Sequence, residues 1–264
     1  MPDPTAYLLD LDGTLYASGG AIPGAVEAID RLRRAGAPFR LVTNTTSRSR
    51  GMLVERLRHY GFTVGEPDIL TATLAGAELA RSDGLLRVAP FVPKPALTDL
   101  TGLELVGGTS GRSAASGGPA AVIVGDLGDR WTYGLLQEAF DYVMAGARLI
   151  ALSRDRYWLR DGRLALDAGP FVAALEYASG GTAVVAGKPS QIFFLAGLRS
   201  LGVTDPGSVA MVGDDLWSDV EGAQRAGLQG WLVRTGKFRE ETLRSSGITP
   251  DRVLASVAEL LRSP

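Results

Sequence analysis

Both ends of the sequence alternate short apolar runs with amphipathic helical patterns. The first third reads AYLLDL, IPGAVEAIDRLRRAG, PFRLVTN and SRSRGMLVERLRHYG, and the last third repeats the alternation from TAVVAG to ASVAELLR. This alternation is typical of parallel strands joined by crossover helices. The sequence therefore predicts an α/β fold in which both ends contribute to one Rossmann-like, doubly wound parallel sheet.

The middle of the chain has a different sequence pattern from the two ends. It contains PAAVIVGD, WTYGLLQEAFDYVMAG, ARLIALS and PFVAALEYASG, which again favour strands and helices. A chain of 264 residues is long enough for two unequal domains. We therefore expect residues 1–78 and 184–264 to form one domain, and residues 79–183 to form a second, inserted α/β domain.

Composition excludes several kinds of chemistry. The chain has no cysteine and one histidine, His59, so a metal ion would be bound by oxygen and a Ser-His-Asp site has almost nothing to work with. A net charge of -2 offers no basic face to nucleic acid. No apolar run reaches the roughly 18 residues that span a bilayer, and the N-terminus lacks the basic start of a secretory signal. We therefore expect no nucleic acid or membrane partner and a cytoplasmic location.

Polar residues follow the apolar runs at four places. In open α/β sheets the ligand binds outside the carboxyl ends of the strands, so these residues are candidates for one site. Each has a structural explanation when taken singly, because Asp, Asn and Gly-Lys-Pro also favour turns and caps. Together they predict a shared site, formed by Asp10 and Asp12 after YLL, Thr43 and Asn44 after FRLV, Lys188 after TAVVAG, and Asp214, Asp215 and Asp219 after VAMVG.

Electrostatics restricts what such a cluster can bind. Two carboxylates about 5 Å apart repel by about 3 kcal/mol at an effective dielectric constant near 20, so protons or a cation must compensate. With oxygen ligands alone, Mg²⁺ is the natural cation, since it uses few carboxylates and accepts a phosphate oxygen. Thr43, Asn44 and Lys188 suit phosphoryl oxygens as hydroxyl, amide and ammonium donors. The sequence thus predicts a site for a phosphate dianion bridged to Mg²⁺.

Four segments carry a resemblance to a known family. DLDGTLY, LVTNTTSRS, AGKPS and VGDDLWSD, in that order, resemble the four motifs of the haloacid dehalogenase (HAD) superfamily of aspartate-nucleophile phosphatases. The insertion between the second and third motifs resembles the C2-type cap of the NagD-like proteins, subfamily IIA. The resemblance implies a HAD core with an inserted C2-type cap, and a Mg²⁺-dependent phosphatase that hydrolyses a small phosphorylated metabolite.

The resemblance also implies roles for the first aspartates. Asp10 would be the nucleophile that forms an aspartyl-phosphate, and Asp12 the general acid for the leaving group and then the base for water. The carboxylates of Asp10 and Asp214 and the backbone carbonyl of Asp12 would bind Mg²⁺. Residues i and i+2 of a strand share a face, so Asp10 and Asp12 can address one substrate from one side.

The remaining motif residues would bind or support. By the same resemblance, Thr43, Asn44 and Lys188 would hold the phosphoryl group. Asp219 would orient Lys188 or a metal-bound water, and Asp215 is a supporting candidate for the same role.

Substrate choice is less constrained. The second half of the chain resembles the phospholysine phosphohistidine inorganic pyrophosphate phosphatases and related HAD-like hydrolases, but some of these have serine where this chain has Asp12, which weakens the inference about substrate. The cap is expected to select the substrate, with Tyr157 and Trp158 as candidates or as packing residues. A phosphomutase, a pyrophosphatase, a dehalogenase and a non-catalytic Mg²⁺/phosphate-binding module stay open, as does a homodimer.

Overall fold

The computed structural model describes residues 3–17, 19–114, 117–160 and 162–261. Its contacts divide the chain into two compact units. The first comprises Met1–Thr43, Gly51–Leu70 and Lys188–Pro264, and the second comprises Asn44–Arg50 and Thr71–Gly187. Residues 44–50, 71–78 and 184–187, which we expected in the first domain, group with the second unit. For residues 71–78 the reason is that helix α3 (Ala72–Ser82) packs with the second unit.

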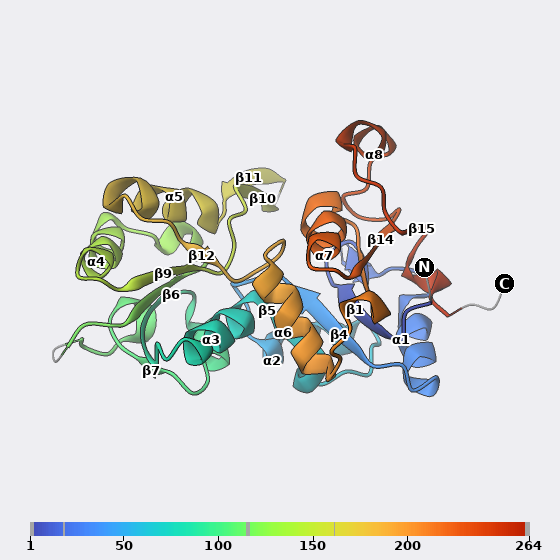
Figure 1. Ribbon diagram of the computed structural model, residues 1–264, viewed down its shortest axis with the longest axis horizontal. Helices are drawn as coiled ribbons and strands as arrows, with labels where there is room; N and C mark the ends of the chain where they lie inside the picture. Colours follow the sequence, from blue (N-terminus) through green and yellow to red (C-terminus); the bar gives the residue numbers. More distant parts are fainter. Residues whose placement is uncertain (1–2, 18, 115–116, 161, 262–264) are drawn as a thin grey trace. The chain divides into compact units, whose positions relative to one another are not determined.

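The first unit is built on a six-stranded sheet with the order β15-β14-β13-β1-β4-β5 (Figure 1). The pairings of β1 with β13 and β4, of β13 with β14 and of β14 with β15 are parallel. A mixed α/β fold with a doubly wound parallel sheet is therefore confirmed. The strands are β1 (Ala6–Asp10), β4 (Phe39–Thr43), β5 (Ile69–Thr71), β13 (Val209–Gly213), β14 (Gln229–Val233) and β15 (Arg252–Leu254).

Strand β1 is buried on both faces because its successive side chains point to opposite sides. Tyr7 and Leu9 belong to one buried cluster with side chains of α1 (Ala25–Arg34) and α2 (Arg50–His59). Leu8 points the other way, toward α6 (Gln191–Leu201), where a Cβ on Gly197 would lie 2.8 Å from its Cδ1. The close approach of α6 at Gly197 fixes β1 between two helical layers.

The segments that follow β1, β13 and β14 contain further secondary structure of the first unit. A short antiparallel hairpin, β2 (Tyr16–Ala17) and β3 (Gly20–Ala21), follows β1. After β13 the chain forms a π-helical segment, Leu216–Glu221, which continues into α7 (Gly222–Arg225). Helix α8 (Glu240–Ser246) follows β14.

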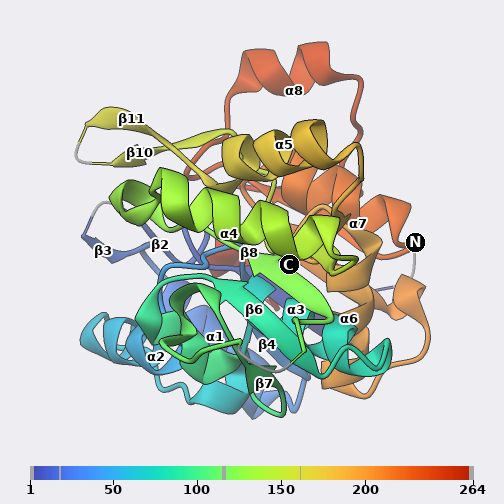
Figure 2. The ribbon, with the colours of Figure 1, turned by 90° about the vertical axis from the view of Figure 1, so that its left-hand side faces the viewer.

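The second unit has its own parallel sheet, with the order β12-β9-β8-β6-β7. Its helices α4 and α5 cover one face, and α3 covers the other (Figures 1 and 2). An antiparallel hairpin, β10–β11, precedes α5. The remaining elements are β6 (Arg87–Phe91), β7 (Glu104–Leu105), β8 (Ala121–Val124), α4 (Tyr133–Met144), β9 (Arg148–Ala151), β10 (Tyr157–Arg160), β11 (Arg163–Leu166), α5 (Ala168–Ser179) and β12 (Val184–Val185).

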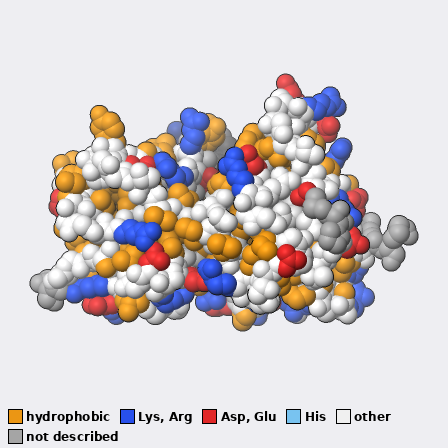
Figure 3. All heavy atoms as spheres, viewed as in Figure 1, with side chains coloured by type: hydrophobic (Ala, Val, Ile, Leu, Met, Phe, Trp, Pro, Cys, Tyr) orange, Lys and Arg blue, Asp and Glu red, His pale blue; other side chains and the backbone are white. Residues whose placement is uncertain are grey.

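Two surface properties bear on the partners expected from sequence. Within the described residues, every helix is too short or too polar to cross a membrane. On the face drawn in Figure 3, cationic and anionic side chains are interspersed. The expected absence of a nucleic acid partner stays a prediction.

Candidate active site

The candidate residues gather where adjacent strands of the first sheet end. Asp10 is the last residue of β1, Thr43 is the last residue of β4, and Asp214 directly follows β13. Strand β1 lies between β4 and β13, and all three run parallel, so their carboxyl ends share one edge. Doubly wound sheets bind ligands at this position, outside the carboxyl ends of the strands where the strand order reverses, here between β13 and β1.

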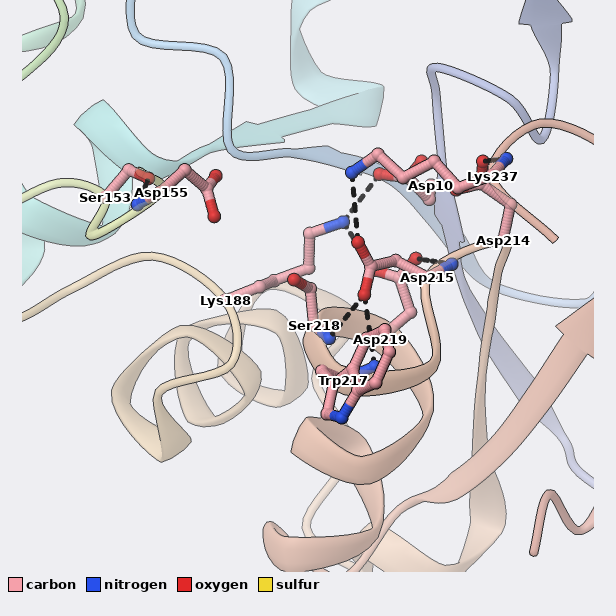
Figure 4. Close-up of polar contacts among 10 residues, drawn as sticks. All are labelled: Asp10, Ser153, Asp155, Lys188, Asp214, Asp215, Trp217, Ser218, Asp219 and Lys237. Atoms are coloured by element: carbon pink, nitrogen blue, oxygen red, sulfur yellow. Dashed lines mark hydrogen bonds and ion pairs between the residues drawn. The ribbon is translucent and has the colours of Figure 1, made fainter. Parts of the chain in front are cut away.

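Lys188 joins two of the aspartates. Its Nζ lies 2.5 Å from Oδ1 of Asp10 and 2.6 Å from Oδ1 of Asp219, and all three side chains are at least nine-tenths buried (Figure 4). Burial acts to lower the pKa of Lys188, but the two carboxylates outweigh it and raise that pKa above its ordinary value. Lys188 is therefore held as a buried cation between Asp10 and Asp219.

Three buried carboxylates crowd together at this edge. Asp10, Asp214 and Asp219 each offer one oxygen, and these oxygens all lie within 4.8 Å of one another. Burial, and then the charges of Asp10 and Asp219, raise the pKa of Asp214 to about 7. Burial also raises the pKa of Asp10, against the opposing charges of Lys188 and, more weakly, Lys237. The cluster thus carries more negative charge than its lysines neutralise easily, which is the condition for binding a cation.

Asp214 is held by the loop after β14 and by the turn after β1. The backbone N–H of Lys237 donates to Oδ2 of Asp214 over 2.6 Å. A Cβ on Gly13 would lie 2.0 Å from that oxygen, and a Cβ on Gly236 would lie 1.9 Å from it. Both glycines also have positive φ, so a side chain is excluded there by conformation as well as by space. These two glycines were not predicted as site residues.

Asp215 holds Lys237 rather than Lys188. Its Oδ2 lies 3.0 Å from Nζ of Lys237, and its Oδ1 accepts N–H groups of Trp217 and Ser218, each over 3.0 Å, at the start of the π-helical segment (Figure 4). Burial acts to raise the pKa of Asp215, but Lys237 and these N–H groups hold it below its ordinary value. The supporting role expected for Asp215 is thus directed at a residue that we had not predicted. The one signal for it was rarity, since Lys237 is one of three lysines in the chain.

Asp12 differs from Asp10 in both exposure and backbone. Asp12 is exposed and lies beyond the end of β1, in a single bridge with Tyr16, so the strand alternation that we expected to align it with Asp10 does not extend that far. The reason is the turn at Gly13, which has a φ of 85°. The phenol of Tyr16 donates to Oδ2 of Asp12 over 3.1 Å. Burial, and then the charge of Asp12, raise the pKa of Tyr16, which keeps it a donor.

The two polar residues after β4 are placed differently. Thr43 is buried, with 3% of its surface exposed, whereas Asn44 is half-buried and groups with the second unit. Oδ1 of Asn44 lies 2.8 Å from the position of a Cβ on Gly187, the residue before Lys188. Asn44 therefore packs against the backbone that leads to Lys188.

The two aromatic residues proposed for the cap lie on strand β10 of the second unit. Tyr157 is 55% exposed and Trp158 is 41% exposed, so neither is a buried packing residue. Their contact with substrate stays a prediction.

Comparison with known proteins agrees with this arrangement. A family profile described as haloacid dehalogenase-like hydrolase matches residues 7–103, and a related HAD-hydrolase-like profile matches residues 185–260. Haloacid dehalogenase-like hydrolase domain-containing protein 2 of Rattus norvegicus is 43% identical over 234 residues, covering 89% of this chain and 85% of that protein. Phospholysine phosphohistidine inorganic pyrophosphate phosphatase of Homo sapiens is 35% identical over 258 residues, covering 96% and 91%.

Solved structures give the same result. The p-nitrophenyl phosphatase from Archaeoglobus fulgidus superposes with a TM-score of 0.87 at 31% identity, covering 98% of both chains. NagD from E. coli K-12 superposes with a TM-score of 0.85 at 26% identity, again covering 98% of both chains.

The similarity to hydrolases and phosphatases over nearly the whole chain defines the class of this protein as a hydrolase of phosphate esters. The chain belongs to the haloacid dehalogenase-like hydrolase family. Within that family its neighbours are those of the NagD-like branch, subfamily IIA, as the sequence motifs indicated.

Proposed function

We propose that this protein is a Mg²⁺-dependent phosphatase that hydrolyses a small phosphorylated substrate through an aspartyl-phosphate on Asp10. The observation that carries the proposal is the pairing of the Asp10 carboxylate with a buried ammonium, 2.5 Å away, beside a second buried carboxylate, Asp214. Two relatives described above are phosphatases by name, one of pyrophosphate and phosphoamino acids and one of p-nitrophenyl phosphate, which supports the reaction class.

The residues present fit Mg²⁺. Asp10 and Asp214 offer oxygen ligands, and the raised pKa of Asp214 shows that its charge is poorly neutralised by the protein alone. Both oxygens of Asp219 accept hydrogen bonds from the protein, Oδ1 from Lys188 and Oδ2 from the N–H of Asp215, whereas Lys188 contacts Asp10 at Oδ1. We therefore assign the ion to Asp10, Asp214 and the backbone carbonyl of Asp12. When bound, Mg²⁺ would supply positive charge that stabilises the transferring phosphoryl oxygens.

In the first step, a carboxylate oxygen of Asp10 attacks phosphorus and the bond from phosphorus to the leaving oxygen breaks. Asp12 gives its proton to that leaving oxygen, so the departing group leaves as a neutral hydroxyl. The exposure of Asp12 suits this task, because the leaving group extends away from the buried cluster. The hydrogen bond from Tyr16 fixes one oxygen of Asp12 and leaves the other available for proton transfer.

In the second step, Asp12 acts as a base. It takes a proton from water, and the water oxygen attacks phosphorus as the bond to Asp10 breaks. The products are inorganic phosphate, a restored Asp10 carboxylate and a protonated Asp12, ready for the next cycle. The same residue serves both steps because the proton that it loses in the first is replaced in the second.

Lys188 provides a fixed charge throughout. Its ammonium contacts the carboxylate of Asp10, which receives the phosphoryl group. It is therefore positioned to stabilise the negative charge on the transferring oxygens. Asp219 prevents the lysine side chain from changing position as the charge on Asp10 changes. Thr43 and Asn44, at the end of the neighbouring strand, are proposed to donate to the same oxygens.

The test is hydrolysis of p-nitrophenyl phosphate with Mg²⁺, with and without a chelator, by wild type and by Asp10→Asn. We expect Asp10→Asn to lower kcat by on the order of 10³-fold or more, and the chelator to abolish activity. Asp141→Asn, on the exposed side of α4, is the matched control and should keep full activity. Turnover that survives both Asp10→Asn and chelation would rule out the mechanism, and absence of turnover by wild type across a panel of phosphate esters would favour the binding module.

A further inference from the structure

Lys237 lies in the segment that joins β14 to α8, and it reaches back to the acidic cluster. Strand β14 ends at Val233, and the backbone N–H of Lys237 already contacts Asp214. Its side chain extends over the cluster to Asp215 (Figure 4). The site therefore contains a second ammonium, which the mechanism above does not use.

The two ammonium groups of the site differ in exposure. The side chain of Lys188 is 4% exposed and binds two aspartates, whereas the side chain of Lys237 is 72% exposed and is paired with Asp215. An ammonium has three N–H donors, so Lys237 keeps donors that face solvent. Lys188 is therefore confined to the buried cluster, whereas the exposed ammonium of Lys237 can reach an anionic group outside it.

The backbone that carries Lys237 is fixed on both sides. The hydroxyl of Thr235 donates to the carbonyl of Gly13 over 2.5 Å, which ties the segment to the turn after β1. On the other side, Phe238 packs against a buried cluster that includes Leu216 and Val220. The ammonium is thus presented from a fixed backbone, so little conformational entropy is lost there when it binds a ligand.

A purely structural role for Lys237 explains its position less well than binding of a ligand does. Asp215 is largely buried, but the ammonium of Lys237 is exposed, so water and salt screen the ion pair and limit its contribution to stability. The chain has only three lysines, and arginine is its usual basic residue. The two lysines of the first unit, Lys188 and Lys237, both lie at the acidic cluster. A flexible stem with a compact charge suits a group that follows a phosphate anion.

We propose that Lys237 binds a second anionic group of the substrate, next to the phosphoryl group that is transferred to Asp10. The substrate class is then a phosphoryl compound that carries a further negative group close to the transferred phosphoryl group, such as a diphosphate. Asp215 holds the ammonium in place until the substrate arrives. This inference rests on the proposed phosphatase function and specifies its substrate.

The test compares two substrates that differ in the leaving side. Inorganic pyrophosphate has a second anionic group there, and p-nitrophenyl phosphate does not. For Lys237→Met we expect kcat/KM with pyrophosphate to fall about tenfold or more, mainly through KM, while kcat/KM with p-nitrophenyl phosphate changes by less than about twofold. Lys237→Arg should retain most of the pyrophosphate activity. Arg244→Met, which removes an exposed cation from α8, should behave as wild type on both substrates.

Binding without turnover separates this inference from the proposed function. In the Asp10→Asn background, calorimetric titration with pyrophosphate and with orthophosphate, each with Mg²⁺, should show that Lys237→Met weakens pyrophosphate binding about tenfold and orthophosphate binding much less. An equal loss of affinity for both anions would show that Lys237 acts by positioning Asp214, and it would overturn the inference. Unchanged affinity for both anions would also overturn it. Failure of the phosphatase function would appear instead as absence of turnover by wild type.

Discussion

The two sheets of this protein share an architecture and differ in how they use polar residues at strand ends. In the first sheet, Asp10 and Asp214 lie at the ends of adjacent strands and their carboxylates converge. In the second sheet, Asp126 follows β8 by one residue, and its Oδ1 accepts the N–H of Gly128 over 2.8 Å. Ser153 follows β9 in the same way and accepts the N–H of Asp155 over 3.0 Å.

The difference teaches what distinguishes a site from a turn. Both sheets carry polar side chains beyond their strands, so polarity at the edge is not sufficient. In the second sheet each of these two side chains is used by backbone N–H groups within two residues, which is ordinary turn geometry. In the first sheet, carboxylates and lysines from distant parts of the sequence contact one another, at an electrostatic cost that only a bound cation or anion offsets.

The largest expected effect comes from Lys188→Met, which leaves two buried carboxylates without their cation. We expect kcat to fall on the order of 10³-fold and the free energy of unfolding to fall by about 3 kcal/mol in urea. Ser153→Ala in the second sheet removes only the acceptor of the N–H of Asp155, so it should lower the free energy of unfolding by about 1 kcal/mol. Comparable destabilisation by the two variants would contradict the contrast between the sheets.

The next effect is that of Asp12→Asn, which removes the proposed base. We expect kcat to fall by about 10² to 10⁴-fold, with phosphate trapped on Asp10, because an amide cannot take a proton from water. Mass spectrometry of acid-quenched protein should detect the added phosphoryl mass. The double variant Asp10→Asn/Asp12→Asn is the control and should not gain it; a gain there would place the phosphoryl group on another residue.

The smallest expected effect separates two glycines that have the same kind of backbone conformation. Gly236 has a φ of 59° and Gly111, in the second unit, has a φ of 72°, so alanine costs about 1 to 2 kcal/mol of backbone strain at either position. Only at Gly236 would the new Cβ strike Asp214, since nothing lies within 4 Å of it at Gly111. We expect Gly236→Ala to weaken Mg²⁺ binding about tenfold, measured by the shift of Tm with Mg²⁺ concentration, and Gly111→Ala to leave that shift unchanged.

The sequence was sufficient to predict the fold class and the strand-end aspartates because both depend on local patterns. An apolar run followed by a polar residue identifies a buried parallel strand and its carboxyl end, and this located Asp10, Thr43 and Asp214 at one edge. The resemblance predicted that Asp219 orients Lys188 or a metal-bound water, and in the structure the ammonium of Lys188 donates to Oδ1 of Asp219.

Contacts without a local pattern were missed. Lys237 and Asp215 are 22 residues apart, and nothing in the spacing indicates that they meet. The phenol of Tyr16 reaches Asp12 because of the turn at Gly13, whose backbone conformation the sequence suggests without showing where the side chains point. The grouping of α3 with the second unit had no local signal either, since its helical pattern is the same whichever sheet it packs against.

The order of strands in the first sheet has a consequence for biosynthesis. Ala6 pairs with Val209, so the strand that carries Asp10 meets one of its two neighbours only when most of the chain has left the ribosome. Until Lys188 and Val209–Gly213 have been made, β1 exposes an apolar edge and Asp10 has neither its ammonium nor Asp214. On the proposed mechanism the emerging protein is therefore inactive, and the unpaired edge of its first strand is open to aggregation until synthesis is nearly complete.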